Sequence, residues 1–105
     1  MKIKVFKLKQ GKESQWKKWC KQLQTTHRKE ALSTIREECG TFESFILYKV
    51  GNEYYTIGIS DTQIPANKNS SLNKEHQKQK RECLEYFLDT EVLYELNTKD
   101  KDYII

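Results

Sequence analysis

Two histidines have the side chains best suited to chemistry in this sequence. His27 and His76 each fall within a run of apolar residues at helical spacing. An imidazole titrates near neutrality, so either ring could act as a general base facing a cavity. The alternative is that each ring fills space between a helix and a sheet and hydrogen-bonds a neighbour, because intermediate burial is ordinary for histidine. Both interpretations stay open at this stage.

The other candidates lie in the segment from Phe42 to Ser60, FESFILYKVGNEYYTIGIS. If the face that carries Tyr48 and Tyr55 meets the helices, these two phenols would line the same cavity as the histidines. If the opposite face does, Tyr54, Phe45 and Glu43 replace them. Glu43 would then need a cationic partner, unless water reaches it at the end of its strand. The candidate ligand-binding residues are therefore His27, His76, Tyr48, Tyr55 and Glu43.

Several kinds of site are disfavoured by spacing. Cys20 and His27 are seven residues apart, as are His76 and Cys83, and seven residues of helix rise by about 10 Å. One metal ion cannot bind both members of such a pair, so we expect no metal. There is no G-x-S-x-G motif and no glycine-rich phosphate loop. We therefore expect no bound cofactor, and whether the protein is an enzyme stays open.

The segment 42–60 predicts a β-hairpin around which the fold is organised. Gly51-Asn52 is typical of a two-residue turn in which glycine supplies a positive φ. Val50 then pairs with Glu53, which fixes the register of the whole hairpin. Both faces of this hairpin are apolar, whereas a hairpin with one wet face alternates more cleanly. We therefore expect helices on one face and a partner chain on the other.

The remaining elements follow in order. Residues 2–9 predict a strand, and a long helix should start at Lys12 or Glu13 and run to about Cys39. Near Ala31 the apolar stripe drifts, so the helix should either bend there or rotate its contact face. A second helix, capped by Ser70 or Ser71, should reach about Leu88, and residues 91–97 predict a fourth strand. The apolar residues 102–105 are expected to be docked.

These elements give the order βαββαβ, a ferredoxin-like α+β fold in one domain, residues 1–105. Four antiparallel strands would carry two helices on one face. The opposite apolar face would be costly to expose in a monomer, so we expect a homodimer that closes as a dimeric α+β barrel.

Charge and cysteine content limit partners and location. The net charge of +4 is uneven: residues 1–30 carry +8 and residues 31–105 carry −4. The basic residues are spread along the chain and no RNA-recognition signature occurs, so we expect no nucleic acid partner. No apolar run could span a bilayer, so we expect no membrane partner. Three cysteines without a CxxC motif favour free thiols in the cytoplasm.

Several segments together resemble a small uncharacterised bacterial family with a ferredoxin-like fold. The similar segments are Val5–Glu13 (VFKLKQGKE), His27–Leu32 (HRKEAL), Glu43, His76, and Glu82-Cys83. That family brings no established activity.

More distantly, the sequence resembles the antibiotic-biosynthesis-type monooxygenases and the haem-degrading enzymes of the same architecture. This resemblance implies a ligand between sheet and helices, with His76 facing it. No Asn occurs in residues 2–9, and both tryptophans lie in the first helix. We therefore expect a small-molecule-binding protein. A monooxygenase- or isomerase-type enzyme that uses His76 or His27 as base is the first alternative, and a protein-interaction module is the second.

Overall fold

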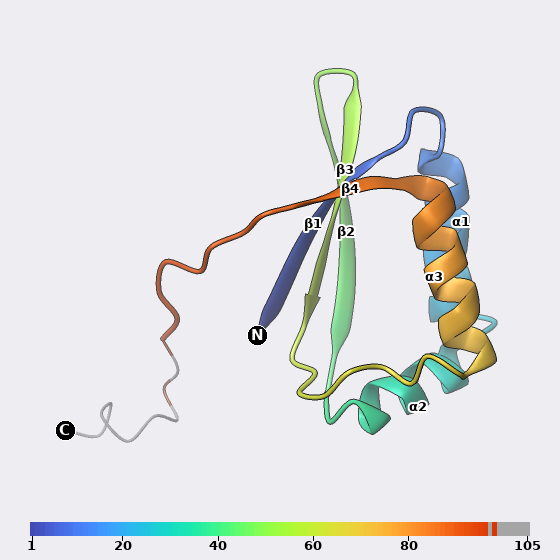
Figure 1. The fold of residues 1–105 in the computed structure, drawn as a ribbon, viewed down its shortest axis with the longest axis vertical. Helices are drawn as coiled ribbons and strands as arrows, with labels where there is room; N and C mark the ends of the chain where they lie inside the picture. Colours follow the sequence, from blue (N-terminus) through green and yellow to red (C-terminus); the bar gives the residue numbers. More distant parts are fainter. Residues whose placement is uncertain (97, 99–105) are drawn as a thin grey trace.

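The computed structural model describes residues 1–96 and 98, which form an α+β fold with a four-stranded antiparallel sheet and three helices (Figure 1). The elements, in chain order, are β1 (Lys2–Leu8), α1 (Glu13–Gln24), α2 (Arg28–Glu37), β2 (Glu43–Val50), β3 (Glu53–Ser60), α3 (Ser71–Cys83) and β4 (Leu84–Leu88).

The sheet has the strand order β2-β3-β1-β4. β1 is central and pairs antiparallel with both β3 and β4, so the first strand of the chain holds the last one in place. The predicted hairpin register is confirmed along its full length, from Glu43 opposite Ser60 to Val50 opposite Glu53. Gly51 has a φ of 62°, the positive value that the turn requires.

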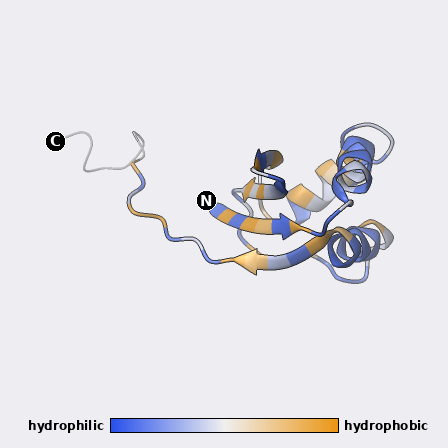
Figure 2. Ribbon diagram, turned by 90° about the horizontal axis from the view of Figure 1, so that it is seen from above, coloured by the Kyte–Doolittle hydropathy of each residue, from blue (hydrophilic) through white to orange (hydrophobic). Residues whose placement is uncertain are grey.

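The helices lie on one side of the sheet, and the chain beyond β4 leaves on the other side (Figure 1). Hydrophobic and hydrophilic residues alternate along β1, while much of the helical surface is hydrophilic (Figure 2). The hydrophobic core lies between these layers. Its buried members are Leu8, Trp16, Trp19, Leu72, Cys83 and Leu84. The core is small because most helix positions are charged or polar.

The single long helix predicted from residue 12 to about Cys39 is wrong, because the structure divides it into α1 and α2. The break lies at residues 25–27, earlier than the bend or rotation expected near Ala31. Thr25 is a β-branched residue, and its hydroxyl donates to the Lys21 carbonyl at 2.7 Å. His27 then occupies the position before the first turn of α2. The break turns α2 across the lower end of the helical layer (Figure 1).

The predicted cap of the second helix is confirmed, but its predicted end is not. Ser70 Oγ accepts from the backbone N–H of Asn73 at 3.1 Å. The helix ends at Cys83, and residues 84–88 form β4 rather than its last turn. The fourth strand predicted at residues 91–97 is therefore wrong for residues 91–96, which have no regular structure. Residue 97 and the predicted docked tail 102–105 lie outside the described residues.

The face of the hairpin that meets the helices is the one that carries Phe45 and Thr56. Trp16 Nε1 donates to Thr56 Oγ1 at 3.2 Å, and the Trp16 and Phe45 rings meet edge to face with centroids 5.5 Å apart. The assumption that Tyr48 and Tyr55 face the helices is wrong. Both faces are apolar, and Gly58 leaves room for the Phe45 ring on the face that the helices cover.

Candidate ligand cavity

A cavity of about 710 Å³ lies between the helix-covered face of the sheet and the three helices. Its walls come from β1, β2, β3, all three helices and the loop before α3. Its volume lies within the range of about 300–1,000 Å³ that is common for small-molecule sites. The apolar lining includes Leu23, Ala31, Leu32, Ile35, Phe45, Ile59, Ile64 and Leu72. The polar lining combines charged side chains with uncharged ones.

His76 projects from α3 into this cavity, and its hydrogen bonding sets which nitrogen carries the proton. Trp19 Nε1 donates to His76 Nδ1 at 2.9 Å. Because Nδ1 accepts, the neutral ring carries its proton on Nε2. Burial, with a smaller contribution from the positive charge of Lys80, lowers the pKa of His76 to about 4. At neutral pH the ring is therefore an uncharged donor.

Three charged side chains of the cavity lining lie near one another: Lys80, Glu43 and Glu38. Lys80 lies one turn after His76 on α3, and burial is the main reason that its pKa is lowered. Burial likewise raises the pKa of Glu43, at the start of β2, and the neighbouring Glu38 raises it further. Glu43 still keeps a solvent-exposed part, so it stands at the mouth of the cavity.

Phe45 forms the apolar floor next to this charged end. Its ring packs edge to face on both Trp16 and His76, with centroids 5.5 and 5.9 Å apart. A Cβ at Gly58 would lie 2.8 Å from the Phe45 ring, closer than carbon atoms can approach without movement. The absence of a side chain at Gly58 therefore lets Phe45 lie flat against β3.

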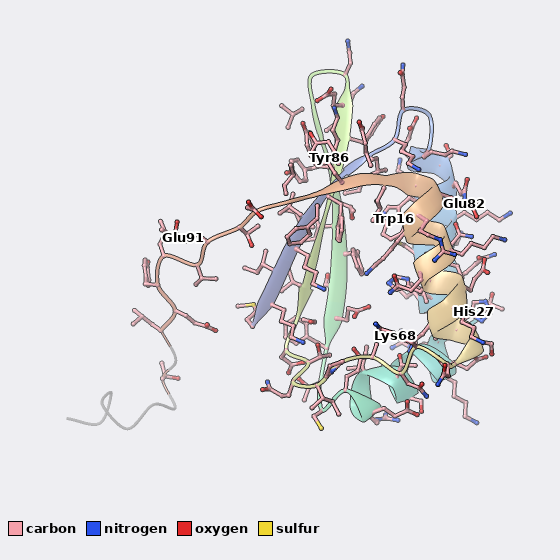
Figure 3. The ribbon with its side chains drawn as sticks, in the orientation of Figure 1. Trp16, His27, Lys68, Glu82, Tyr86 and Glu91 are labelled. Carbon is pink, nitrogen blue, oxygen red and sulfur yellow. The ribbon has the colours of Figure 1, made fainter. Side chains whose placement is uncertain are left out.

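The structure brings only two of the five sequence candidates into the cavity lining, His76 and Glu43. His27 is half-buried at the other side of Trp19: its ring centroid lies 5.8 Å from that of Trp19 and its Nδ1 is 4.0 Å from Glu30. In Figure 3 His27 lies at the helical side of the molecule, away from the sheet. Both histidines thus pack on Trp19, but only His76 lines the cavity.

The two tyrosines lie on the opposite face of the sheet, outside the cavity. Tyr48 and Tyr55 stack with ring centroids 5.3 Å apart, and Tyr55 donates to Glu53 at 2.9 Å. They were expected in the cavity only because their face of the hairpin was assumed to meet the helices. Of the alternative set, Phe45 and Glu43 line the cavity and Tyr54 does not.

Sequence reasoning missed Trp19 and Lys80 as site residues. Trp19 fixes the proton position on His76, and its polar N–H was a signal, since a buried indole usually finds an acceptor. Lys80 was recognisable by its spacing of four from His76, which places both on one side of a helix. Cys20 also lines the cavity, where burial raises its thiol pKa to about 11 and keeps it protonated.

Two further features bear on the kind of site. Within residues 1–96 and 98, no group of three or more His, Cys, Asp or Glu side chains lies close enough to hold a metal ion. No helix in the same part of the chain is both long and apolar enough to cross a membrane.

Comparison with known proteins gives one match. Residues 1–101 match the model of a protein family described as a family of unknown function, DUF6176. No curated protein matches the chain, and no solved structure does. The expected similarity to a small uncharacterised family is thereby confirmed.

Proposed function

Because this chain belongs to DUF6176, a family without an assigned activity, we propose its function from the cavity: it binds a small molecule with an anionic head and an apolar body. The observation that carries the proposal is the excess of cationic over acidic side chains in a lining that also contains a group of apolar side chains. The charged end selects the head, and the apolar walls take the body.

The charge balance of the lining favours an anion. The five cationic residues are Lys2, Lys4, Arg28, Lys68 and Lys80, and the two acidic residues are Glu38 and Glu43. None of these seven forms an ion pair within 4.0 Å in the part of the chain that the structure describes. Lys80 is half-buried, and burial and the neighbouring Lys4 lower its pKa although Glu43 and Glu38 act in the opposite direction. A bound carboxylate or phosphate would stabilise the protonated form of Lys80.

His76 adds a directional donor at the same end. Its Nε2–H is uncharged at neutral pH, so it can donate to an anionic oxygen without competing for the negative charge. Hydrogen bonds to charged acceptors are stronger than neutral ones. Together, Lys80 supplies charge and His76 supplies geometry.

The test is ligand-induced stabilisation with a matched set of probes. Decanoate, decanol and decylamine share an apolar chain and differ in head-group charge. We expect decanoate to raise Tm more than decanol and decylamine to have no effect. Equal stabilisation by all three would contradict the anionic head, and no stabilisation by any fatty or aromatic carboxylate or phosphate would overturn the proposal.

The variant Lys80→Met isolates the cationic end of the cavity. Methionine keeps the length and apolar stem of Lys80 but removes its charge, so decanoate affinity should fall at least tenfold. Lys78→Met is the control, because Lys78 lies on the same helix outside the cavity lining and is 4.0 Å from Glu82. An equal loss in both variants would show a non-specific charge effect.

The enzymatic alternative, with His76 or His27 as base, has weaker support. Nδ1 of His76 accepts from Trp19 and Nε2 carries the proton, so the neutral ring has no free lone pair for a base. His27 is outside the cavity lining. Any activity that is abolished by His76→Gln and follows an apparent pKa near neutrality would favour the enzyme over the binding protein.

We also propose a ferredoxin-like fold that dimerises through the uncovered face of the sheet. From its other edge the strand order reads β4-β1-β3-β2, which supports the split βαβ arrangement. On the uncovered face Ile46 is 47% exposed and Tyr48 is also exposed. A dimeric α+β barrel would bury both. Sedimentation of the full chain as a monomer at high micromolar concentration would contradict this proposal.

The three free cysteines support a reducing compartment, and we propose the cytoplasm. Accumulation of the tagged protein in another compartment would contradict it. If the dimer forms but no ligand is found, the interaction-module alternative gains support.

A further inference from the structure

Residues 91–96, EVLYEL, form an exposed apolar arm beyond β4. The side chains of Val92, Leu93, Tyr94 and Leu96 are 53%, 85%, 80% and 86% exposed. The arm leads away from the helices and the sheet, with Glu91 far from the other labelled residues (Figure 3). It helps to explain a radius of gyration of 15.5 Å, against about 13 Å for a compact chain of this length.

The arm has the pattern of a strand but lacks a strand partner. Val92, Tyr94 and Leu96 alternate with Glu91, Leu93 and Glu95, which is the period of an extended chain with one apolar face. Within the described residues, however, the arm has no regular structure. A strand forms only when another strand satisfies its backbone N–H and C=O groups. The missing component is therefore a sheet edge.

The free edge best suited to this arm is β2. It is an outermost strand of the sheet, eight residues long, whereas the other outermost strand, β4, has only five. Its side chains Ile46, Tyr48 and Val50 are exposed on the uncovered face. An arm paired along β2 would place Val92, Tyr94 and Leu96 beside these apolar groups.

The arm cannot pair with β2 of its own chain. It leaves from β4 at the opposite edge, and four inter-strand spacings separate β4 from a position outside β2, roughly 19 Å. Val92 follows Leu88 by four residues, which span about 14 Å when fully extended. The Thr90 hydroxyl also donates to the Ile3 carbonyl at 3.1 Å, which holds the start of the arm at the β1 side.

We propose that residues 91–96 of one copy add as a fifth strand to the β2 edge of a second copy, and that the second copy returns the same contact. The occupant is a second copy because this chain carries both the exposed apolar arm and the outermost strand β2 with its exposed apolar side chains. The exchange presupposes the homodimer proposed above. It goes beyond that dimer by assigning the segment and the edge that hold it together.

Mixed cysteine cross-linking tests the exchange directly. The background is Cys39→Asn, which removes the exposed native thiol and keeps a residue suited to the φ of 56° at this position. One variant adds Tyr94→Cys and the other adds Ile46→Cys. When the two variants are mixed and oxidised, the yield of disulfide-linked heterodimer should be far higher than the yield of disulfide-linked homodimer from either variant alone. A cross-link within one chain that carries both substitutions, with no heterodimer, would overturn the proposal.

The strength of the dimer gives an independent test. Tyr94→Asp should raise the dimer dissociation constant at least tenfold in sedimentation equilibrium, because Tyr94 belongs to the apolar face of the arm. Leu93→Asp is the matched control on the other face, and its effect should be smaller.

Three results would overturn the exchange. A monomeric full chain would overturn the homodimer as well. A dimer that Tyr94→Asp leaves unchanged would overturn the arm exchange alone, as would equal weakening by both substitutions.

Discussion

The β2–β3 hairpin has two apolar faces, of which one packs against the core and the other is exposed. On one face Leu47 and Phe45 pack against the core, next to Trp16 and the cavity. On the other, Ile46 and Tyr48 are exposed. Neighbouring residues of one strand thus differ in environment because helices cover only one side (Figure 2). Apolar sequence alone does not bury a face; a covering element must be available.

The largest expected difference between the faces comes from Trp16. Its side chain is 1% exposed and its Nε1 bonds Thr56. Trp16→Ala should lower the free energy of unfolding by about 3–5 kcal/mol, because it leaves a cavity and an unpaired hydroxyl. Urea denaturation at neutral pH measures this loss. A loss below about 1 kcal/mol would mean that the covered face is not the main source of stability.

The second effect is a pH dependence that comes from His76, which packs against Phe45 on the covered face. The pKa of His76 is about 4 in the folded chain and 6.5 in the unfolded chain. Between these values the unfolded chain binds the proton and the folded chain does not, so stability is present above pH 6.5 and is lost as pH falls to about 4. The loss should reach about 3 kcal/mol, at about 1.4 kcal/mol per pKa unit.

His76→Gln should abolish this part of the pH dependence, because the amide does not titrate but can still accept from Trp19. Urea denaturation between pH 4 and 7 compares the two proteins. Hydrogen bonds from the Thr41 hydroxyl and from backbone N–H groups lower the pKa of Asp61 to about 2, but Asp61 is present in both proteins, so its contribution cancels in the comparison. Equal slopes in the two proteins would contradict the buried neutral imidazole.

Gly58 gives a smaller effect that tests contact within the covered face. Gly58→Ala should cost about 1–3 kcal/mol, because the added methyl group would displace the Phe45 ring. In Phe45→Leu the same change should cost less, and the double-mutant cycle measures the coupling. Simple additivity of the two changes would show that Phe45 does not lie over Gly58.

The smallest effect should come from the uncovered face. In dilute solution, Ile46→Ala should change the free energy of unfolding by less than about 0.5 kcal/mol, while its neighbour Leu47→Ala should cost more than 1 kcal/mol. Thermal unfolding at several protein concentrations further separates the effect of Ile46→Ala from that of Leu47→Ala. If the uncovered face holds a dimer, the cost of Ile46→Ala should grow with concentration.

The sequence was sufficient for features that depend on local chemistry. The turn at Gly51 fixed the hairpin register, and Ser70 marked the start of α3. Features that depend on distant partners were not predictable. Leu84–Leu88 is an apolar run that suits the last turn of a helix or a strand, and only pairing with β1 decides between them.

The candidate site followed the same rule. His76 was identified because its position in a helical stripe is a local pattern. The choice between Tyr48 and Phe45 could not be made from a local pattern, since both faces of the hairpin are apolar and the helices could cover either. Glu43 lines the cavity because it shares the face of Phe45, which is the face that the helices cover. His27 was misplaced because the helix breaks just before it, so the stripe that included it does not continue.

The central position of β1 has a consequence for the speed and order of folding. The β2–β3 hairpin joins residues close in sequence and can form within microseconds. β1 must instead find β4, some eighty residues later in the chain, before the sheet is complete. During synthesis the edge of β1 that pairs with β4 therefore stays unpaired until nearly the whole described chain has left the ribosome. We expect sheet closure, rather than hairpin formation, to limit the folding rate.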